Sequence, residues 1–152
     1  MSRRSQITMT DEEVADFLEE QRTVICATNG RDDWPHLMPL WYVVRDGELW
    51  SWTYAKSQKV RNLERDDRAT LQVEAGEAYD QLRGVMIKVR VVLHRDTDDV
   101  TALGTEIFTR YTGADTGDVR ETVAAQAPKR VGLQFMPQGL ASWDHRKLGG
   151  SY

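Results

Sequence analysis

Hairpin signals between short β-type segments constrain the fold of this chain more than any other feature. Asn29-Gly30 and Asp46-Gly47 are dipeptides that favour the tight turn between two antiparallel strands. Segments rich in β-branched and aromatic residues flank both turns and recur later in the chain. Because closure removes exposed strand edges, such a meander favours a closed or nearly closed barrel, with a sandwich as the alternative. The expected strands lie at about 23–28, 35–44, 48–53, 69–75, 85–94, 130–136 and 139–143.

Short helices are expected between some of these strands. Thr10 and Glu13 have the spacing of a capping box, and Ser57 is a favourable N-cap. The expected helices lie at about 10–21, 57–65, 97–113 and 118–127. The fold class is therefore mainly β with short helices (α+β), with six or seven antiparallel strands. Residues 1–9 show no such pattern, and we expect them to be disordered or loosely docked.

Composition limits the class of protein. A chain of 152 residues is expected to form one domain, spanning 1–152. No apolar run approaches the roughly 20 residues of a membrane span, and the N-terminus lacks the apolar stretch of a signal peptide. The net charge of −4 gives no reason to expect binding to nucleic acid or anionic lipid. The single cysteine, Cys26, lies in an apolar run, so we expect a buried thiol and a cytoplasmic protein.

Several common catalytic sites have no support in the sequence. There is no Gly-x-Ser-x-Gly elbow for a nucleophilic serine and no Gly-x-Gly-x-x-Gly for a dinucleotide. One cysteine and three scattered histidines give no spacing for zinc, so no metal site is expected. No residue stands out as an acid–base catalyst, and Tyr54 and Arg110 are only weak candidates for a proton donor.

The segment from Lys56 to Arg61 has the composition of an anion receptor. Lys56, Lys59 and Arg61 bring three cations to the start of the expected helix, beside the Ser57 hydroxyl. Cations at a helix N-terminus oppose the helix dipole, whereas a bound anion there would offset them. The sequence therefore indicates a phosphate site, with a solvated helix face as the alternative.

Two further segments are unusual. Pro39 lies inside an expected strand, where it removes a ladder donor and leaves backbone groups free at Met38 and Leu40; a simple edge strand is the alternative. Trp143 and Leu148 are poor residues for a free C-terminal tail, although a frayed terminus is the alternative. Trp34 and Trp41 are expected in the core or in an interface.

The order of these features resembles one family. A strand rich in Trp and Thr, then Lys-Ser-Gln-Lys-Val-Arg-Asn-Leu, then Asp-Asp-Arg before another strand is similar to the flavin-binding split barrels related to pyridoxamine 5'-phosphate oxidase. Within that superfamily the chain looks most like the branch that uses the deazaflavin coenzyme F420. The similarity runs from about Val14 to Gly150, and it favours the split barrel over the sandwich.

This resemblance implies roles for particular residues. Ser57 and its neighbours Lys56, Gln58 and Lys59 would hold the cofactor phosphate, and Arg61 and Asn62 would support the phosphate or the tail. Met38 and Leu40 would face the ring edge, with Trp52 and Thr53 near its redox end. In a homodimer, Trp143, Arg146 and Lys147 would complete a cofactor site, either the chain's own or its partner's.

The resemblance also implies an activity. The expected function is F420-dependent hydride transfer to an unsaturated organic substrate. Alternatives are an FMN-binding oxidase or electron-transfer flavoprotein, and a module that binds cofactor without catalysis. The C-terminal Trp and Arg-Leu-x-Asp-Arg elements of true pyridoxamine-phosphate oxidases are missing, which argues against the vitamin B6 reaction.

Overall fold

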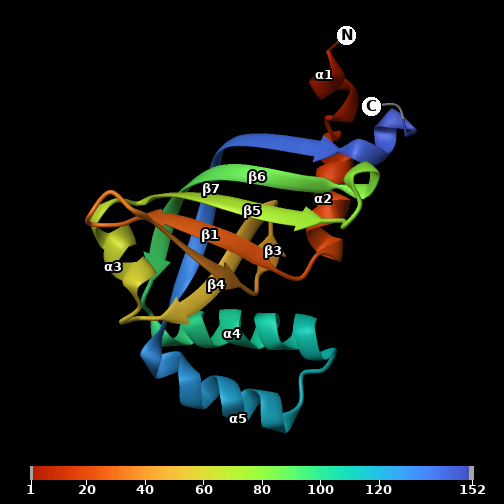
Figure 1. Cartoon of the computed structure of the whole chain (residues 1–152). Helices are drawn as coiled ribbons and strands as arrows, with labels where there is room; N and C mark the ends of the chain where they lie inside the picture. Colours follow the sequence, from red (N-terminus) through yellow and green to blue (C-terminus); the bar gives the residue numbers. More distant parts are fainter. Residues whose placement is uncertain (1, 151–152) are drawn as a thin grey trace.

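The computed structural model describes residues 2–150, and these contain one antiparallel sheet of seven strands in the order β2-β1-β5-β6-β7-β4-β3. The sheet curls into a barrel (Figure 1) whose two edge strands, β2 and β3, do not pair with each other. This confirms the expected mainly β, split-barrel class. The strands are β1 (Val24–Asn29), β2 (Pro35–Leu40), β3 (Val43–Arg45), β4 (Glu48–Tyr54), β5 (Arg68–Ala75), β6 (Arg83–His94) and β7 (Arg130–Asp144).

Both hairpins expected from the turn dipeptides are present. β1 pairs with β2, and β3 pairs with β4, each in antiparallel register. In the second turn, Asp46 and Gly47 have φ of 50° and 78°. Two consecutive positive φ values define the primed turn that matches strand twist, and Asp and Gly adopt them more readily than most residues.

The expected strand at 35–44 is wrong as a single element. The chain leaves β2 after Leu40 and enters β3 at Val43, at the opposite edge of the sheet. Tyr42 makes this crossing: its side chain is fully buried and its hydroxyl donates to the carbonyl oxygen of Leu18 at 2.6 Å. The apolar pattern continues through the crossing because Tyr42 is in the core, so the pattern alone does not reveal the break.

Two strands expected near the C-terminus form one. β7 runs from Arg130 to Asp144 without interruption and pairs with β6 along its length. The register shifts between Lys88 and Val89, opposite Pro137 and Gly139. A bulge at this point absorbs the Pro-Gln-Gly segment that reads as a turn in the sequence.

The four expected helices are present, with an additional helix before them. They are α2 (Asp11–Glu20), α3 (Gln58–Arg65), α4 (Thr97–Thr112) and α5 (Gly117–Gln126), and one-turn helices occur at Tyr79–Gln81, Ala127–Lys129 and His145–Leu148. The additional helix is α1 (Arg3–Ile7), capped by the Ser2 side chain. Residues 2–9 are therefore ordered and docked, which agrees with the docked alternative and not with disorder, while Met1 lies outside the described residues.

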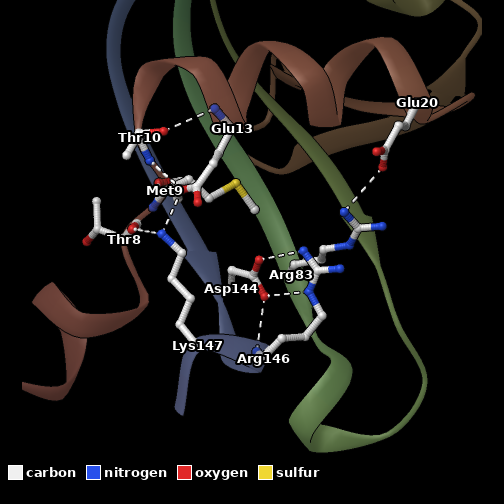
Figure 2. Close-up of polar contacts among 10 residues, drawn as sticks. Thr8, Met9, Thr10, Glu13, Glu20, Arg83, Asp144, Arg146 and Lys147 are labelled. Atoms are coloured by element: carbon white, nitrogen blue, oxygen red, sulfur yellow. Dashed lines mark hydrogen bonds and ion pairs between the residues drawn. The ribbon is translucent and has the colours of Figure 1, made fainter. Parts of the chain in front are cut away.

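The N-terminal segment is ordered because it packs on the C-terminal end of the chain (Figure 2). The amide of Met9 donates to Ser142 Oγ at 3.0 Å. Lys147 Nζ donates to the Thr8 carbonyl oxygen at 2.9 Å and to Glu13 Oε2 at 2.6 Å. These contacts join residues more than 130 positions apart, so no local sequence pattern could have indicated them.

Two hydrophobic cores lie on opposite faces of the sheet. The larger fills the barrel and includes Tyr42, Leu71 and Phe135. The smaller lies between β4 and the helices α4 and α5, which cover one side of the barrel (Figure 1), and includes Trp52 and Ile107. Successive residues of β4 point to the two cores in turn, because side chains alternate along a strand.

Gly104 allows α4 to approach β4. A Cβ atom at this position would lie 2.4 Å from the Trp52 ring. We expect Gly104→Ala to destabilise the protein by about 1–3 kcal/mol through overpacking, in spite of the better helix propensity of alanine. Denaturant unfolding measures the change. Gly117→Ala is the control, because nothing lies within 4 Å of a Cβ atom there; equal stability of the two variants would contradict the prediction.

Candidate functional site

A cleft of about 1040 Å³ lies between α3 and the β1–β2 hairpin. Helix α3 begins after Ser57, whose hydroxyl accepts from the amide of Val60 at 3.4 Å. Val60 and Leu63 turn into the barrel core, so the opposite side of the helix faces the cleft. The cleft is lined by Gly30, Arg31, Asp32, Trp34, Pro35, His36, Gln58, Arg61, Asn62, Glu64 and Arg65.

The charges of this cleft favour an anion. Its lining carries three arginines and two carboxylates. Glu64 is paired with Arg95 at 3.2 Å, and the Asp32 carboxylate accepts from the amide of Trp34 at 3.1 Å. Among the described residues, neither Arg31 nor Arg61 has a side-chain hydrogen bond or ion pair. Two guanidinium groups in a chain of net charge −4 are thus available to an incoming anion.

The inner end of the cleft is polar and fixed. Asn62 is fully buried, and its Nδ2 donates to Thr28 Oγ1 at 3.0 Å. Gln58 Nε2 donates to Asn62 Oδ1 at 2.9 Å. Asn62 therefore joins α3 to β1 and holds the Gln58 amide at the cleft wall. Of the expected cofactor residues, the structure brings Gln58, Arg61 and Asn62 together here.

Lys59, which we expected to hold the cofactor phosphate or to lie on a solvated helix face, does not line this cleft. Its side chain is only 6% exposed and turns into the barrel, where Nζ donates to Thr53 Oγ1 at 2.9 Å. Burial lowers the pKa of the Lys59 ammonium, the nearby Cys26 thiol opposes this shift, and the charge of Arg130 adds to it. No carboxylate pairs with Lys59 among the residues described. Lys56, by contrast, is exposed, as expected of a residue just before the helix.

The thiol beside Lys59 is buried, as the apolar run around it predicted. Cys26 is almost fully enclosed, and this burial raises the pKa of its thiol to about 12. A thiol that stays protonated is a poor nucleophile. Cys26 is therefore part of the barrel core and offers no catalytic group to the cleft.

β2 forms the free edge beside the cleft. Met38 is in register with Cys26, and Leu40 with Val24, both of which are buried inside the barrel. Met38 and Leu40 therefore lie on the inner face of an edge strand that pairs only with β1. Pro39 is tolerated because one side of this strand needs no ladder partner, which agrees with the edge-strand alternative.

Trp52 and Thr53 point to opposite faces of β4. The Thr53 hydroxyl meets Lys59 on the inner face. The Trp52 ring is buried against Gly104 of α4, with the Arg130 guanidinium 4.5 Å from its centroid. The Trp52 side chain is thus part of the second core, and only Thr53 directs its side chain to the side on which α3 lies.

The expected C-terminal site residues lie at the other end of the barrel from α3 (Figure 1). The strand registers show this separation. At the α3 end, Thr28 of β1 pairs with Ala69 of β5, which pairs with Val89 of β6. At the C-terminal end, Asp144 of β7 pairs with Arg83 of β6. Arg83 and Val89 are six residues apart on β6, and six strand residues span roughly 20 Å. A single chain therefore does not bring Trp143, Arg146 and Lys147 to the α3 cleft.

The two cations of that end already have partners within the chain (Figure 2). Arg146 Nη2 donates to Asp144 Oδ2 at 2.7 Å, and Lys147 donates to Glu13. The bond from Arg146 holds the pKa of the Asp144 carboxyl below its usual range. The Trp143 ring covers Gly84, where a Cβ atom would lie 2.3 Å from it. The tail is therefore docked, which differs from a frayed terminus.

The two weak candidates for a proton donor lie outside this cleft. The Arg110 guanidinium donates to the carbonyl oxygens of Tyr42, Glu19 and Gln21 at 2.8–2.9 Å and so caps the end of α2. Tyr54 lies with its ring 4.2 Å from the Arg130 guanidinium, on the outer face of β4. Neither side chain lines the cleft.

Eight of the eleven lining residues are outside the expected cofactor set, and six of these eight belong to the β1–β2 hairpin. Arg31, Trp34 and His36 come from the hairpin that Asn29-Gly30 marked, and the pairing of that hairpin with α3 depends on long-range contacts. Trp34 was expected in the core or an interface, yet it is 76% exposed at the cleft wall, so a core position is wrong. An exposed tryptophan beside a turn is the one signal that could have indicated a wall for a planar ligand.

Comparison with known proteins places this fold. A family model described as pyridoxamine 5'-phosphate oxidase matches residues 10–144. The chain belongs to the pyridoxamine 5'-phosphate oxidase family. It is similar to a conserved hypothetical protein from Mycobacterium tuberculosis, with 40% identity and a TM-score of 0.91 over 100% of this chain and 95% of that one. No curated protein sequence matches it.

More distant structures share the fold of this family member. An F420 reductase has 20% identity and a TM-score of 0.71, covering 87% of this chain and 98% of its own. The heme storage protein HutZ from Vibrio cholerae has 16% identity and a TM-score of 0.68, covering 87% and 94%. At these identities the likeness is one of fold alone. Within the described residues, no helix has the length and apolar character needed to cross a membrane.

The burial of Lys59 predicts a pH-dependent stability. Because its folded-state pKa is lowered, charged Lys59 destabilises the fold below that pKa, and the penalty disappears as pH rises toward the ordinary lysine value of about 10.4. We expect the stability of the wild type, relative to Lys59→Met, to rise between about pH 7 and pH 10. Denaturant unfolding at both pH values measures it. Exposed Lys56→Met is the control and should show no such trend; a flat difference for Lys59→Met would refute the prediction.

Proposed function

We propose that the protein binds coenzyme F420 through the cleft between α3 and the β1–β2 hairpin and uses it to reduce an unsaturated organic substrate. The observation that carries this proposal is the pair of guanidinium groups of Arg31 and Arg61, which have no side-chain partner among residues 2–150 and lie beside the polar α3 face. A cofactor with a phosphate and a polyglutamate tail presents more negative charge than one phosphate group. The family of the chain, and an F420 reductase among proteins of the same fold, support this choice.

The side chains of the cleft fit the anionic part of such a cofactor. Gln58 and Arg61 would donate to the phosphate, and Arg31 and Arg65 would lie along the tail. When bound, a deazaflavin supplies a hydride carrier whose reactive carbon replaces flavin N5. The share of the protein is to bind, orient and shield the ring, and Met38 and Leu40 on the free edge of β2 are suited to contact it.

Two other functions fit the same fold. An FMN protein would use the same phosphate side chains, but FMN ends at its phosphate and leaves the outer arginines without a role. A module that binds a cofactor without turnover is the second alternative, and the heme storage protein of the same fold gives it some support. Both predict weaker dependence on the outer cations than F420 does.

We also propose that the chain forms a homodimer. Leu37 and Met38 of edge strand β2 are exposed, as are Trp34 and Trp41 directly before and after that strand. Apolar side chains gathered at a free sheet edge favour burial against another subunit. A partner subunit would also explain how Trp143, Arg146 and Lys147 reach a cofactor site, because they lie far from the α3 cleft of their own chain.

The first prediction of this proposal concerns the choice of cofactor. We expect F420 to bind at least tenfold more tightly than FMN at modest ionic strength, which is about 1.4 kcal/mol. Fluorescence titration of the purified protein with each cofactor measures it. Purification of a yellow protein with stoichiometric FMN would overturn the choice.

Variants test whether the cleft is responsible. Arg61→Ala should weaken F420 binding about fivefold, as expected for an exposed charge pair. Arg31→Ala should weaken it by a similar factor, because Arg31 also lines the cleft and has no side-chain partner among the described residues. Arg68→Ala is the matched control, since Arg68 is already bonded to Asp66 at 2.8 Å and lies outside this cleft. Equal affinities for all three variants would exclude the cleft.

The dimer is tested by light scattering at micromolar concentration. We expect the mass of two chains, and we expect Leu37→Asp to shift it toward one chain, because a carboxylate buried in an apolar interface is unfavourable. Glu77→Asp, on an exposed turn, is the control. A wild-type protein that is monomeric with F420 bound would contradict the proposal.

A further inference from the structure

His36 carries a buried nitrogen without a partner inside the candidate cleft. Its Nδ1 atom is shielded from solvent, and it makes no hydrogen bond to any described residue. The ring comes from β2, where His36 is in register with Thr28, the residue that Asn62 contacts from α3. The imidazole therefore lines the same inner end of the cleft as Gln58 and Asn62.

A shielded polar atom without a partner is unfavourable. A buried donor or acceptor that loses water and gains nothing costs roughly 1–3 kcal/mol. The neighbours of His36 do not supply a partner, since the Asn62 amide is already bonded to Thr28 and Gln58. Because Nδ1 is shielded, an incoming hydrogen-bond acceptor removes this penalty once the imidazole ring turns to bring Nδ1 to the cleft.

The charged groups around the ring decide which incoming group is favoured. From the hairpin and from α3 they are Arg31, Asp32, Arg61, Glu64 and Arg65. Glu64 is paired with Arg95 and the Asp32 carboxylate accepts from the Trp34 amide, so three arginines stand against one carboxylate that has no cationic partner among the described residues. A cationic imidazole beside these arginines is stabilised only when an anion binds among them.

We propose that His36 is a proton-dependent ligand for the anionic group of the cofactor, so that the site binds anions more tightly as pH falls. This rests on the proposed function only in placing an anion in the α3 cleft; it does not depend on the ring that the anion carries. Histidine side chains in general change charge between about pH 5 and pH 8. Binding of an anion to the protonated ring takes up a proton, and the affinity therefore rises on the acid side.

The test uses sulfate, whose own charge is constant over this range, so any pH dependence comes from the protein. Binding is followed by NMR shifts of the imidazole and backbone signals at about pH 5.5 and pH 8. We expect the wild type to bind sulfate about tenfold more tightly at the lower pH, which corresponds to one unit of linked proton affinity.

Three variants separate this role from a structural one. His36→Gln should bind weakly and with equal affinity at both pH values, whereas His36→Arg should bind tightly at both, because its charge is permanent. His94→Gln is the matched control: His94 lies outside the cleft, bonded to Gln134 at 2.9 Å, and its loss should leave the wild-type pH dependence unchanged. Circular dichroism confirms that each variant is folded.

Several outcomes would overturn the inference. Equal sulfate affinity at both pH values in the wild type, or an unchanged pH dependence in folded His36→Gln, would exclude His36 as the titrating ligand. Sulfate shifts confined to residues away from α3 and the hairpin would exclude the site. If F420 binds tightly while sulfate affinity is flat with pH, only this inference fails. If sulfate behaves as expected while F420 does not bind, only the proposed function fails.

Discussion

The insertion of α3 into the end of the barrel is the interaction on which the arrangement of the cleft depends. Val60 and Leu63 give the helix an apolar side that packs in the main core. Asn62 then fixes its rotation through the buried bond to Thr28. A buried amide bonded on both sides tolerates little displacement, because either broken bond would leave a polar group unsatisfied. The outward side of α3 must therefore face the hairpin, and the cleft follows from this orientation.

Side chains alternate along β4, so neighbouring residues of this strand face two different parts of the structure. Trp52 faces outward and holds α4 against the sheet through contact with Gly104, while Thr53 faces inward and meets Lys59. One strand thus supports two cores with adjacent residues. The family resemblance implied that Trp52 lies near the redox end of the cofactor ring, yet the Trp52 side chain closes the second core. Thr53, the smaller neighbour, is the one whose side chain remains near the polar end of the barrel.

The sequence could predict what depends on neighbouring residues. Several local features of the sequence are present in the structure. They are the turns at Asn29-Gly30 and Asp46-Gly47, the helix caps at Thr10 and Ser57, and the edge strand that contains Pro39. The crossing at Tyr42, the docking of residues 2–9 and the burial of Lys59 depend on residues far away in the chain. The sequence of α3 predicted that Val60 faces the core, but it did not indicate that the long side chain of the preceding Lys59 also turns inward to Thr53.

The two ends of the barrel differ in how their charges are satisfied. At the C-terminal end, Arg146 and Lys147 each have a carboxylate partner within the chain. At the α3 end, Lys59 has a hydroxyl as its partner, and the shielded Nδ1 of His36 has none within the part of the chain that the structure describes. A fold selected for stability alone would not keep both, because apolar side chains of similar size would remove the penalty. His36 lines the α3 cleft whereas Lys59 does not, so an anion bound in that cleft would offer a partner to His36, at the end of the barrel where we propose that the cofactor binds.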